Sequence, residues 1–197
     1  MARKYSALDT AYTSVMIERL KAGSTSEDSS FFASPGDLEA VDPPADLILL
    51  MDVLEHCADD KSMMEFAVGA SSPQAMFLIT VPAYSRLFSQ HDKLLGHYRR
   101  YSRKQLVSFC QGQKLAVLHS GYFFFSLVPL RLIQLLLEKA GLKKTTQASE
   151  NWTGKKGITQ MISFILWVDF RFCTALTSLG IRLPGLSSYC ICQKSPS

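Results

Sequence analysis

The chain has 197 residues, of which 47% are hydrophobic and 19% are charged, with a formal net charge of +4. This length is enough for one domain with a substantial core, and the composition excludes global disorder. So small a positive charge gives no support to a nucleic-acid-binding surface, and we expect no nucleic-acid partner. The five cysteines form no CxxC pair. We therefore expect reduced, buried thiols in a reducing, cytoplasmic compartment and no zinc site.

The first 120 residues alternate between strand-like and helix-like patterns. The run DLILLMDV, residues 46–53, is almost continuously apolar, which is typical of a parallel strand covered on both faces. Helical periodicity covers 11–20. The alternation predicts an α/β fold with a mainly parallel sheet flanked by helices. The expected strands lie at 5–8, 31–33, 46–53, 75–81 and 114–120.

Two helix starts can be predicted from capping residues. Asp59 and Asp60 place acidic side chains where a helix dipole favours them. Ser102 and Gln105 have the spacing of a capping box and precede an apolar run that begins at Leu106. We therefore expect one helix to begin near residue 60 and another near residue 103.

The carboxyl-terminal part has a different pattern. Two apolar helices are expected at 121–140 and 158–178, and a last strand at 187–192. Arg131 and Asp169 interrupt the two apolar stretches and argue against a helix that spans a membrane, although contact with a membrane surface stays open. We expect a single domain over 1–197. Its α/β core would be 1–120 and 185–197, and 121–184 would form an apolar helical cover.

Three segments together carry a family resemblance. They are ADLILLMDVLEHCADD at 45–60, FLITVPAYSRLFSQHDKLLGHYRRYSRKQL at 77–106 and LPGLSSYCICQK at 183–194. The combination resembles class I S-adenosylmethionine (SAM)-dependent methyltransferases, in particular a bacterial-type group with DVLEH and HD…GHYRRYS motifs. The resemblance implies a Rossmann-like fold, SAM as cofactor and no metal. The family's first strand and its (D/E)xGxGxG loop have no counterpart here, so the sequence corresponds to a family member truncated before that loop.

The resemblance assigns five residues to the cofactor. Asp9, at the end of the first expected strand, would accept hydrogen bonds from the ribose hydroxyls, although a helix N-cap is an equal alternative. Asp37 would accept from the adenine amino group with the Leu38 amide nearby, although aspartate is common in turns. Met51 and Asp52 would lie beside the methionine part of SAM, and simple core packing is the alternative for Met51.

A dense polar cluster follows the strand at 75–81 and would face the substrate. His91 or His97 could act as a general base, because the pKa of histidine lies near neutrality. Tyr98, Arg99 and Arg100 could bind a carboxylate or phosphate of the acceptor. The alternatives are a solvated face or a structural brace at the helix start, and a metal site is less expected than either. The Glu55–His56 pair of the DVLEH turn could equally be structural.

The sequence therefore predicts a SAM-dependent transferase that methylates a small-molecule or lipid-like acceptor. The alternative is a non-catalytic, truncated methyltransferase-like protein that acts as an interaction or membrane-associated module. Either protein would be cytoplasmic or peripheral to a membrane. The surplus of Phe, Leu and Ile in 121–178 favours a hydrophobic acceptor or a membrane-facing surface, and a helical layer that closes the core is the plainer alternative.

Overall fold

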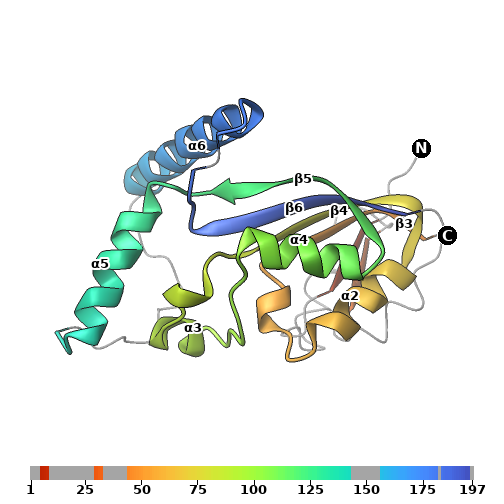
Figure 1. Ribbon diagram of the computed structural model, residues 1–197, viewed down its shortest axis with the longest axis horizontal. Coiled ribbons are helices and arrows are strands. Elements are labelled where there is room, and N and C mark those ends of the chain that lie inside the picture. Colours follow the sequence, from red (N-terminus) through yellow and green to blue (C-terminus); the bar gives the residue numbers. More distant parts are fainter. Residues whose placement is uncertain (1–4, 9–28, 33–43, 143–155, 182, 196–197) are drawn as a thin grey trace.

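A computed structural model describes residues 5–8, 29–32, 44–142, 156–181 and 183–195 (Figure 1). The strands are β1 (Tyr5–Leu8), β2 (Ser29–Phe32), β3 (Ala45–Met51), β4 (Ser71–Pro82), β5 (Leu115–Phe123) and β6 (Ser187–Lys194). The α-helices are α2 (Asp60–Gly69), α3 (Gln90–Leu94), α4 (Arg103–Gly112), α5 (Leu127–Lys139) and α6 (Lys156–Ser178). Two short 3-10 helices, η2 (Leu54–His56) and η3 (Ser85–Leu87), follow β3 and β4. The helix expected at 11–20 lies outside the described residues.

The described strands form two sheets. Four of them pair in the order β3-β4-β6-β5, and β6 runs antiparallel to both of its neighbours while β3 and β4 are parallel. The strands β1 and β2 form a separate parallel pair. The predicted α/β class with a mainly parallel sheet is therefore confirmed, and β6 alone is reversed among the described strands.

The two predicted helix starts are confirmed. Asp59 is the N-cap of α2, and its carboxylate accepts a hydrogen bond from the Ser62 amide at 3.1 Å. The α4 capping box is complete, because Ser102 accepts from the Gln105 amide and Gln105 accepts from the Ser102 amide. Each cap satisfies a backbone amide that has no partner within its helix, and such a cap typically contributes about 1 kcal/mol.

The core lies between the sheet and the layer formed by α2 and α4 (Figure 1). Alternate residues of β4, including Phe77, Ile79 and Val81, point to this layer and are fully buried. Cys190 and Cys192 occupy the same face of β6, as their spacing predicts. All five cysteines are free thiols. Four of them are buried, as expected, whereas Cys57 is half-buried.

Among the described residues, no layer covers the opposite face of β3. Leu47, Leu49 and Met51 are 58%, 53% and 57% exposed, whereas Leu50 on the covered face is 5% exposed. The prediction of a strand covered on both faces is therefore wrong for one face. The reason is that α2 and α4 pack on a single side of the sheet, and β3 is an edge strand within the described sheet.

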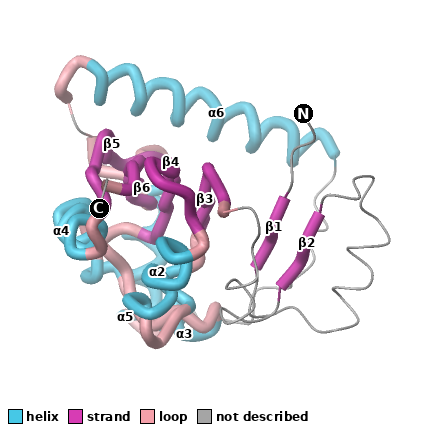
Figure 2. Tube along the Cα trace, turned by 90° about the vertical axis from the view of Figure 1, so that its right-hand side faces the viewer, coloured by secondary structure: helices cyan, strands magenta, loops and turns pink. Residues whose placement is uncertain are grey.

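The helices α5 and α6 follow β5 and precede β6, and α6 lies on the opposite side of the sheet from α2 and α4 (Figure 2). A narrow stripe of α6 contacts the body of the protein: Asp169 accepts from the Ser126 amide at 3.3 Å, and Cys173 is buried. By length and composition, the range Gly157–Ser178 could cross a membrane, and only 11% of an 18-residue window within it is buried. The interrupting Asp169 therefore does not prevent α6 from meeting these criteria, contrary to the sequence-based expectation.

Candidate functional site

The candidate site forms where the loops after β3 and β4 meet. The carboxyl ends of neighbouring parallel strands lie at one edge of a sheet, which is where open α/β folds bind ligands. The Tyr98 amide donates to the Glu55 carbonyl at 2.7 Å, and Arg99 donates to the Ala58 carbonyl. These bonds join two segments that are about 40 residues apart in sequence into one surface.

Asp52 directly follows β3 and has a strained backbone conformation. Its φ is +53°, which is uncommon for a residue other than glycine. The conformation is held because the Asp52 amide donates to the carbonyl oxygen of Thr80 at 3.0 Å and to its hydroxyl at 3.2 Å. Burial raises the pKa of the Asp52 carboxyl, and the nearby His97, the Thr80 hydroxyl and His56 only partly offset that effect. Strain of this kind is often found at functional sites.

Asp92 is the centre of a buried polar network. Its carboxylate accepts from Arg100 Nε at 2.6 Å, from Arg131 Nη2 at 2.8 Å and from the Ser89 amide at 2.9 Å. Its Oδ1 also lies 3.1 Å from Nδ1 of His97. Burial by itself would raise the pKa of Asp92, but the hydrogen bonds from His97 and Arg100 and the charge of Arg100 outweigh it and hold the pKa well below its usual value.

The Asp92 network orients His97. An ionised Asp92 can only accept hydrogen bonds, so it favours a proton on Nδ1 of His97 and leaves the lone pair on Nε2. The His97 side chain is 9% exposed. Such an acid–histidine pair has the arrangement of a positioned general base.

Glu55 and His56 complete the group around His97. A ligand-type atom of each of these three side chains lies within 4.8 Å of those of the other two. The rings of His56 and His97 meet edge to face, with centroids 4.6 Å apart. The Glu55 side chain is fully buried, neither carboxylate oxygen has a hydrogen-bond partner, and burial raises its pKa to about 8.

A second carboxylate braces the neighbouring loop. Asp60 accepts from the Tyr101 hydroxyl and pairs with Arg99 at 2.8 Å. Beside it, an open pocket of about 460 Å³ is lined by polar and aromatic side chains. Its lining residues are Ser85, Phe88, Tyr98, Arg99, Arg100, Tyr101, Gln105 and Phe109.

The predicted site residues fall into three groups. Asp9, Asp37 and Leu38 lie outside the described residues. The structure brings together Met51, Asp52, His97, Tyr98, Arg99 and Arg100, and Met51 and Asp52 are exposed at the end of β3. His91 is half-buried, and burial and the charge of Arg131 lower its pKa.

The two adjacent arginines hold internal contacts. Arg100 is 8% exposed and is paired with Asp92, while it also donates to the Ala83 carbonyl at 3.1 Å. These contacts match the alternative in which the GHYRRYS segment braces the loop. Arg99 is one-third exposed, and Tyr98 is 60% exposed, so both stay accessible to a ligand in the pocket.

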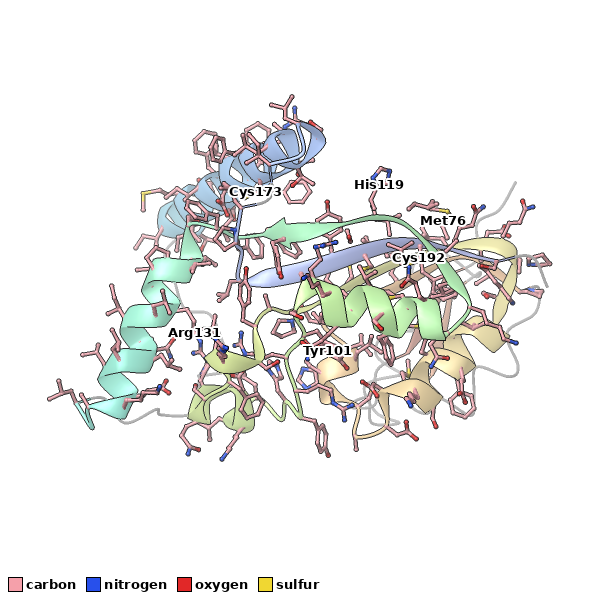
Figure 3. The ribbon with its side chains drawn as sticks, in the orientation of Figure 1. Met76, Tyr101, His119, Arg131, Cys173 and Cys192 are labelled. Carbon is pink, nitrogen blue, oxygen red and sulfur yellow. The ribbon has the colours of Figure 1, made fainter. Side chains whose placement is uncertain are left out.

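Sequence reasoning missed the role of Arg131. This residue lies on α5, is 5% exposed and points toward α3, where it meets Asp92 (Figure 3). A charge inside an apolar helix needs a buried partner, because an unpaired buried charge is costly. The charge of Arg131 within an apolar stretch of sequence therefore indicated a buried partner, but only the fold identifies that partner as Asp92.

The fold is that of class I SAM-dependent methyltransferases. No described protein family and no curated protein matches the sequence. Solved structures do match, although their identity to this chain is too low to indicate more than the fold.

Three of these structures each cover 98% of this chain with a TM-score of 0.56. One comes from the complex of the Haloferax volcanii Trm112 methyltransferase activator with a methyltransferase, at 14% identity and 73% of that chain. Another is described as a sarcosine dimethylglycine methyltransferase of Galdieria sulphuraria, at 12% identity and 70% of that chain. The third is described as a methyltransferase of Bacillus halodurans, at 11% identity and 84% of that chain.

Proposed function

We propose that this chain binds SAM and methylates an oxygen of a lipid-like or other hydrophobic small-molecule acceptor. The observation that carries the proposal is the oriented acid–histidine group at the carboxyl ends of β3 and β4, in a methyltransferase fold. The same fold can support unrelated functions, so the argument rests on this group and not on the fold alone.

The end of β3 fits the expected position of the cofactor. Met51 offers an exposed apolar side chain, and Asp52 offers a carboxylate on a rigidly held backbone. By resemblance, Asp9 would bind the ribose, and Asp37 with Leu38 the adenine. When bound, SAM supplies an electrophilic methyl group on a positively charged sulfur. The protein's part is then to hold the acceptor oxygen in line with that methyl group and to remove its proton.

His97 is the residue that we assign to proton removal. The proton of an acceptor hydroxyl would pass to Nε2, while Asp92 holds Nδ1–H and stabilises the imidazolium that forms. Arg100 and Arg131 keep Asp92 ionised, so it acts as a positioning residue. This assignment prefers His97 over His91, the other candidate from the sequence, because the Asp92 side chain bonds to the ring of His97.

The helices α5 and α6 favour a hydrophobic acceptor at a membrane surface. Outside its contact stripe, α6 is apolar nearly all round, and Phe164 and Trp167 are 64% and 57% exposed. On α5, Leu130 and Leu136 are 62% and 65% exposed. A helix that is apolar on every side is normally buried in protein or in lipid. In the sequence, lysines at 143 and 144 follow α5, a lysine at 155 precedes α6 and Lys156 begins it. Such charges favour an anionic bilayer.

We propose that these helices lie on the membrane and do not cross it. The chain enters α5 from β5 and leaves α6 for β6, and these two strands pair with each other. Both ends of the segment are therefore on one side of a bilayer. The 13 residues of α5 reach only about 20 Å, which is less than the roughly 30 Å of a hydrocarbon core. The protein would then be cytoplasmic and peripheral to a membrane.

The proposal can be tested by methyl transfer from SAM labelled in its methyl group to a total lipid extract in vesicles. We expect label in the lipid phase, and a fall of at least about 100-fold in His97→Gln, since a general base contributes roughly 10²–10⁴-fold. His119→Gln is the matched control, because His119 is exposed on β5 and points away from the site (Figure 3). Label transfer that His97→Gln leaves unchanged would contradict the assignment of the base. Label confined to water-soluble products would contradict the lipid-like acceptor.

A further inference from the structure

The buried carboxylate of Glu55 is the feature of the site that proton transfer by His97 does not explain. Burying a carboxyl group without a hydrogen-bond partner is costly, and native proteins rarely do so without a reason. Glu55 is fully buried, and both of its oxygens lack a hydrogen-bond partner. It is held there because it is part of η2, directly after β3, and its own carbonyl accepts from the Tyr98 amide.

The neighbours of this carboxylate are metal-ligand types. Glu55, His56 and His97 each offer an oxygen or a nitrogen, and these three atoms lie within 4.8 Å of one another. Two imidazoles and one carboxylate form a donor set for Zn²⁺, Fe²⁺ and similar divalent transition metals, and they leave coordination positions open.

The surroundings of His97 match those of a metal-binding histidine. Such a histidine usually donates its second ring N–H to a carboxylate, which fixes the tautomer and the ring orientation. Nδ1 of His97 lies 3.1 Å from Asp92, and Arg100 and Arg131 fix Asp92 in turn. The lone pair of Nε2 is thereby kept for a ligand other than Asp92.

We propose that Glu55, His56 and His97 form a binding site for one divalent transition-metal ion at the carboxyl end of β3. The site departs from the absence of metal that the family resemblance implies. It does not rest on methyl transfer, because the geometry of the donor set is independent of SAM. In the metal-bound chain, His97 is a ligand. Nε2 of His97 is then not free to take a proton, so proton removal by His97 belongs to the metal-free chain.

The test is a calorimetric titration of Zn²⁺ into the full chain after treatment with a chelator. We expect one Zn²⁺ per chain. Affinity should fall at least about 100-fold in Glu55→Gln and in His56→Ala, because loss of an outer partner alone costs roughly 10–100-fold. Glu55→Gln preserves side-chain shape, and His56 is exposed, so His56→Ala is a variant that keeps the fold even if Glu55→Gln does not. His119→Gln is the control and should bind Zn²⁺ like the unaltered chain.

Cobalt distinguishes this site from a rival set of thiols. Cys110, Cys190 and Cys192 also lie within 4.8 Å of one another, but they are fully buried in the core. Bound Co²⁺ should show d–d absorption without a thiolate charge-transfer band. A thiolate band that Cys190→Ser abolishes would overturn the proposal, and so would a folded chain without saturable Zn²⁺ binding. A separate titration of S-adenosylhomocysteine into the metal-free chain tests the proposed function. The metal site and the cofactor site can therefore be refuted independently of each other.

Discussion

The substitution Asp92→Asn should be the most damaging single change at the candidate site. Asp92 is paired with Arg100 and Arg131, both less than 9% exposed, and the change leaves two buried guanidinium groups without a counter-charge. Removing one partner of a buried ion pair typically costs about 3–5 kcal/mol. Total domain stability is about 5–15 kcal/mol, so the variant should be close to unfolding. Arg131→Met should cost less, about 1.5–3 kcal/mol, because Asp92 keeps Arg100 and His97.

Urea unfolding followed by far-UV circular dichroism measures both effects. With a slope of roughly 2 kcal/mol/M, Asp92→Asn should lower the midpoint by about 2 M. The variant that combines Asp92→Asn with Arg131→Met should lose about 1–3 kcal/mol less unfolding free energy than the two single variants together, because the two side chains are in contact. A cost below about 1 kcal/mol for Asp92→Asn, or strict additivity, would refute the conclusion that this network fixes α5 to the site.

The same network should make stability depend on pH. Burial would raise the pKa of Asp92, but hydrogen bonds from His97 and Arg100 lower it further than burial raises it, to well below its usual 3.8. A carboxyl whose pKa is lower in the folded chain contributes stability that is complete above its usual pKa and is lost as the pH falls through the folded-state value. Acid unfolding should therefore begin below about pH 4, and Asp92→Asn should weaken this dependence.

Three further substitutions test the brace, the core and a close backbone contact. Tyr101→Phe removes the hydroxyl that donates to buried Asp60 and should cost about 1–3 kcal/mol in urea unfolding. Phe77→Ala opens a cavity beneath the sheet, where Phe77 is fully buried, and should cost about 3–5 kcal/mol in the same assay. Gly185→Ala places a Cβ against the Phe123 carbonyl oxygen, so the backbone must move, and thermal unfolding should show a loss of about 1–3 kcal/mol.

Each of these changes has a matched control of the same residue type. Tyr98→Phe and Phe164→Ala alter side chains that are 60% and 64% exposed, and each should change stability by less than about 0.5 kcal/mol. Phe164→Ala should nevertheless weaken binding to anionic vesicles if α6 meets a membrane. Gly112 is the last residue of α4, and no atom lies near a Cβ added there. Gly112→Ala should therefore leave stability unchanged or raise it slightly. A control substitution that lowers stability as much as the substitution it is matched to would contradict the packing described above.

The elements with strong local signals could be predicted from the sequence. The apolar runs located β3, β4 and β5, and the capping residues Asp59 and Ser102 located the starts of α2 and α4. Burial depends on neighbours that are distant in sequence, which is why the exposed face of Leu47 and Leu49 was not foreseen. A continuous apolar run shows that both faces of a strand can be buried. It does not show whether other elements of the fold cover both faces.

The candidate site shows the same division. The sequence predicts a polar cluster in the GHYRRYS segment, and the partners of its arginines come from other elements. Arg100 faces Asp92, and Arg131 reaches the same carboxylate from α5, 39 residues away. The sequence could not separate the substrate-binding role from the brace, because an arginine pair has the same appearance in both. The burial of Glu55 likewise becomes visible only in the folded chain.

Titration of S-adenosylhomocysteine into the purified 197-residue chain tests the central claim most directly. We predict saturable binding, measured by calorimetry, that Asp9→Ala abolishes and that Asp52→Asn weakens, while His119→Gln leaves it unchanged. Circular dichroism of each variant would verify that it is folded. Absence of saturable binding by a folded chain would contradict the proposal that this chain is a SAM-dependent methyltransferase, and would favour the non-catalytic alternative.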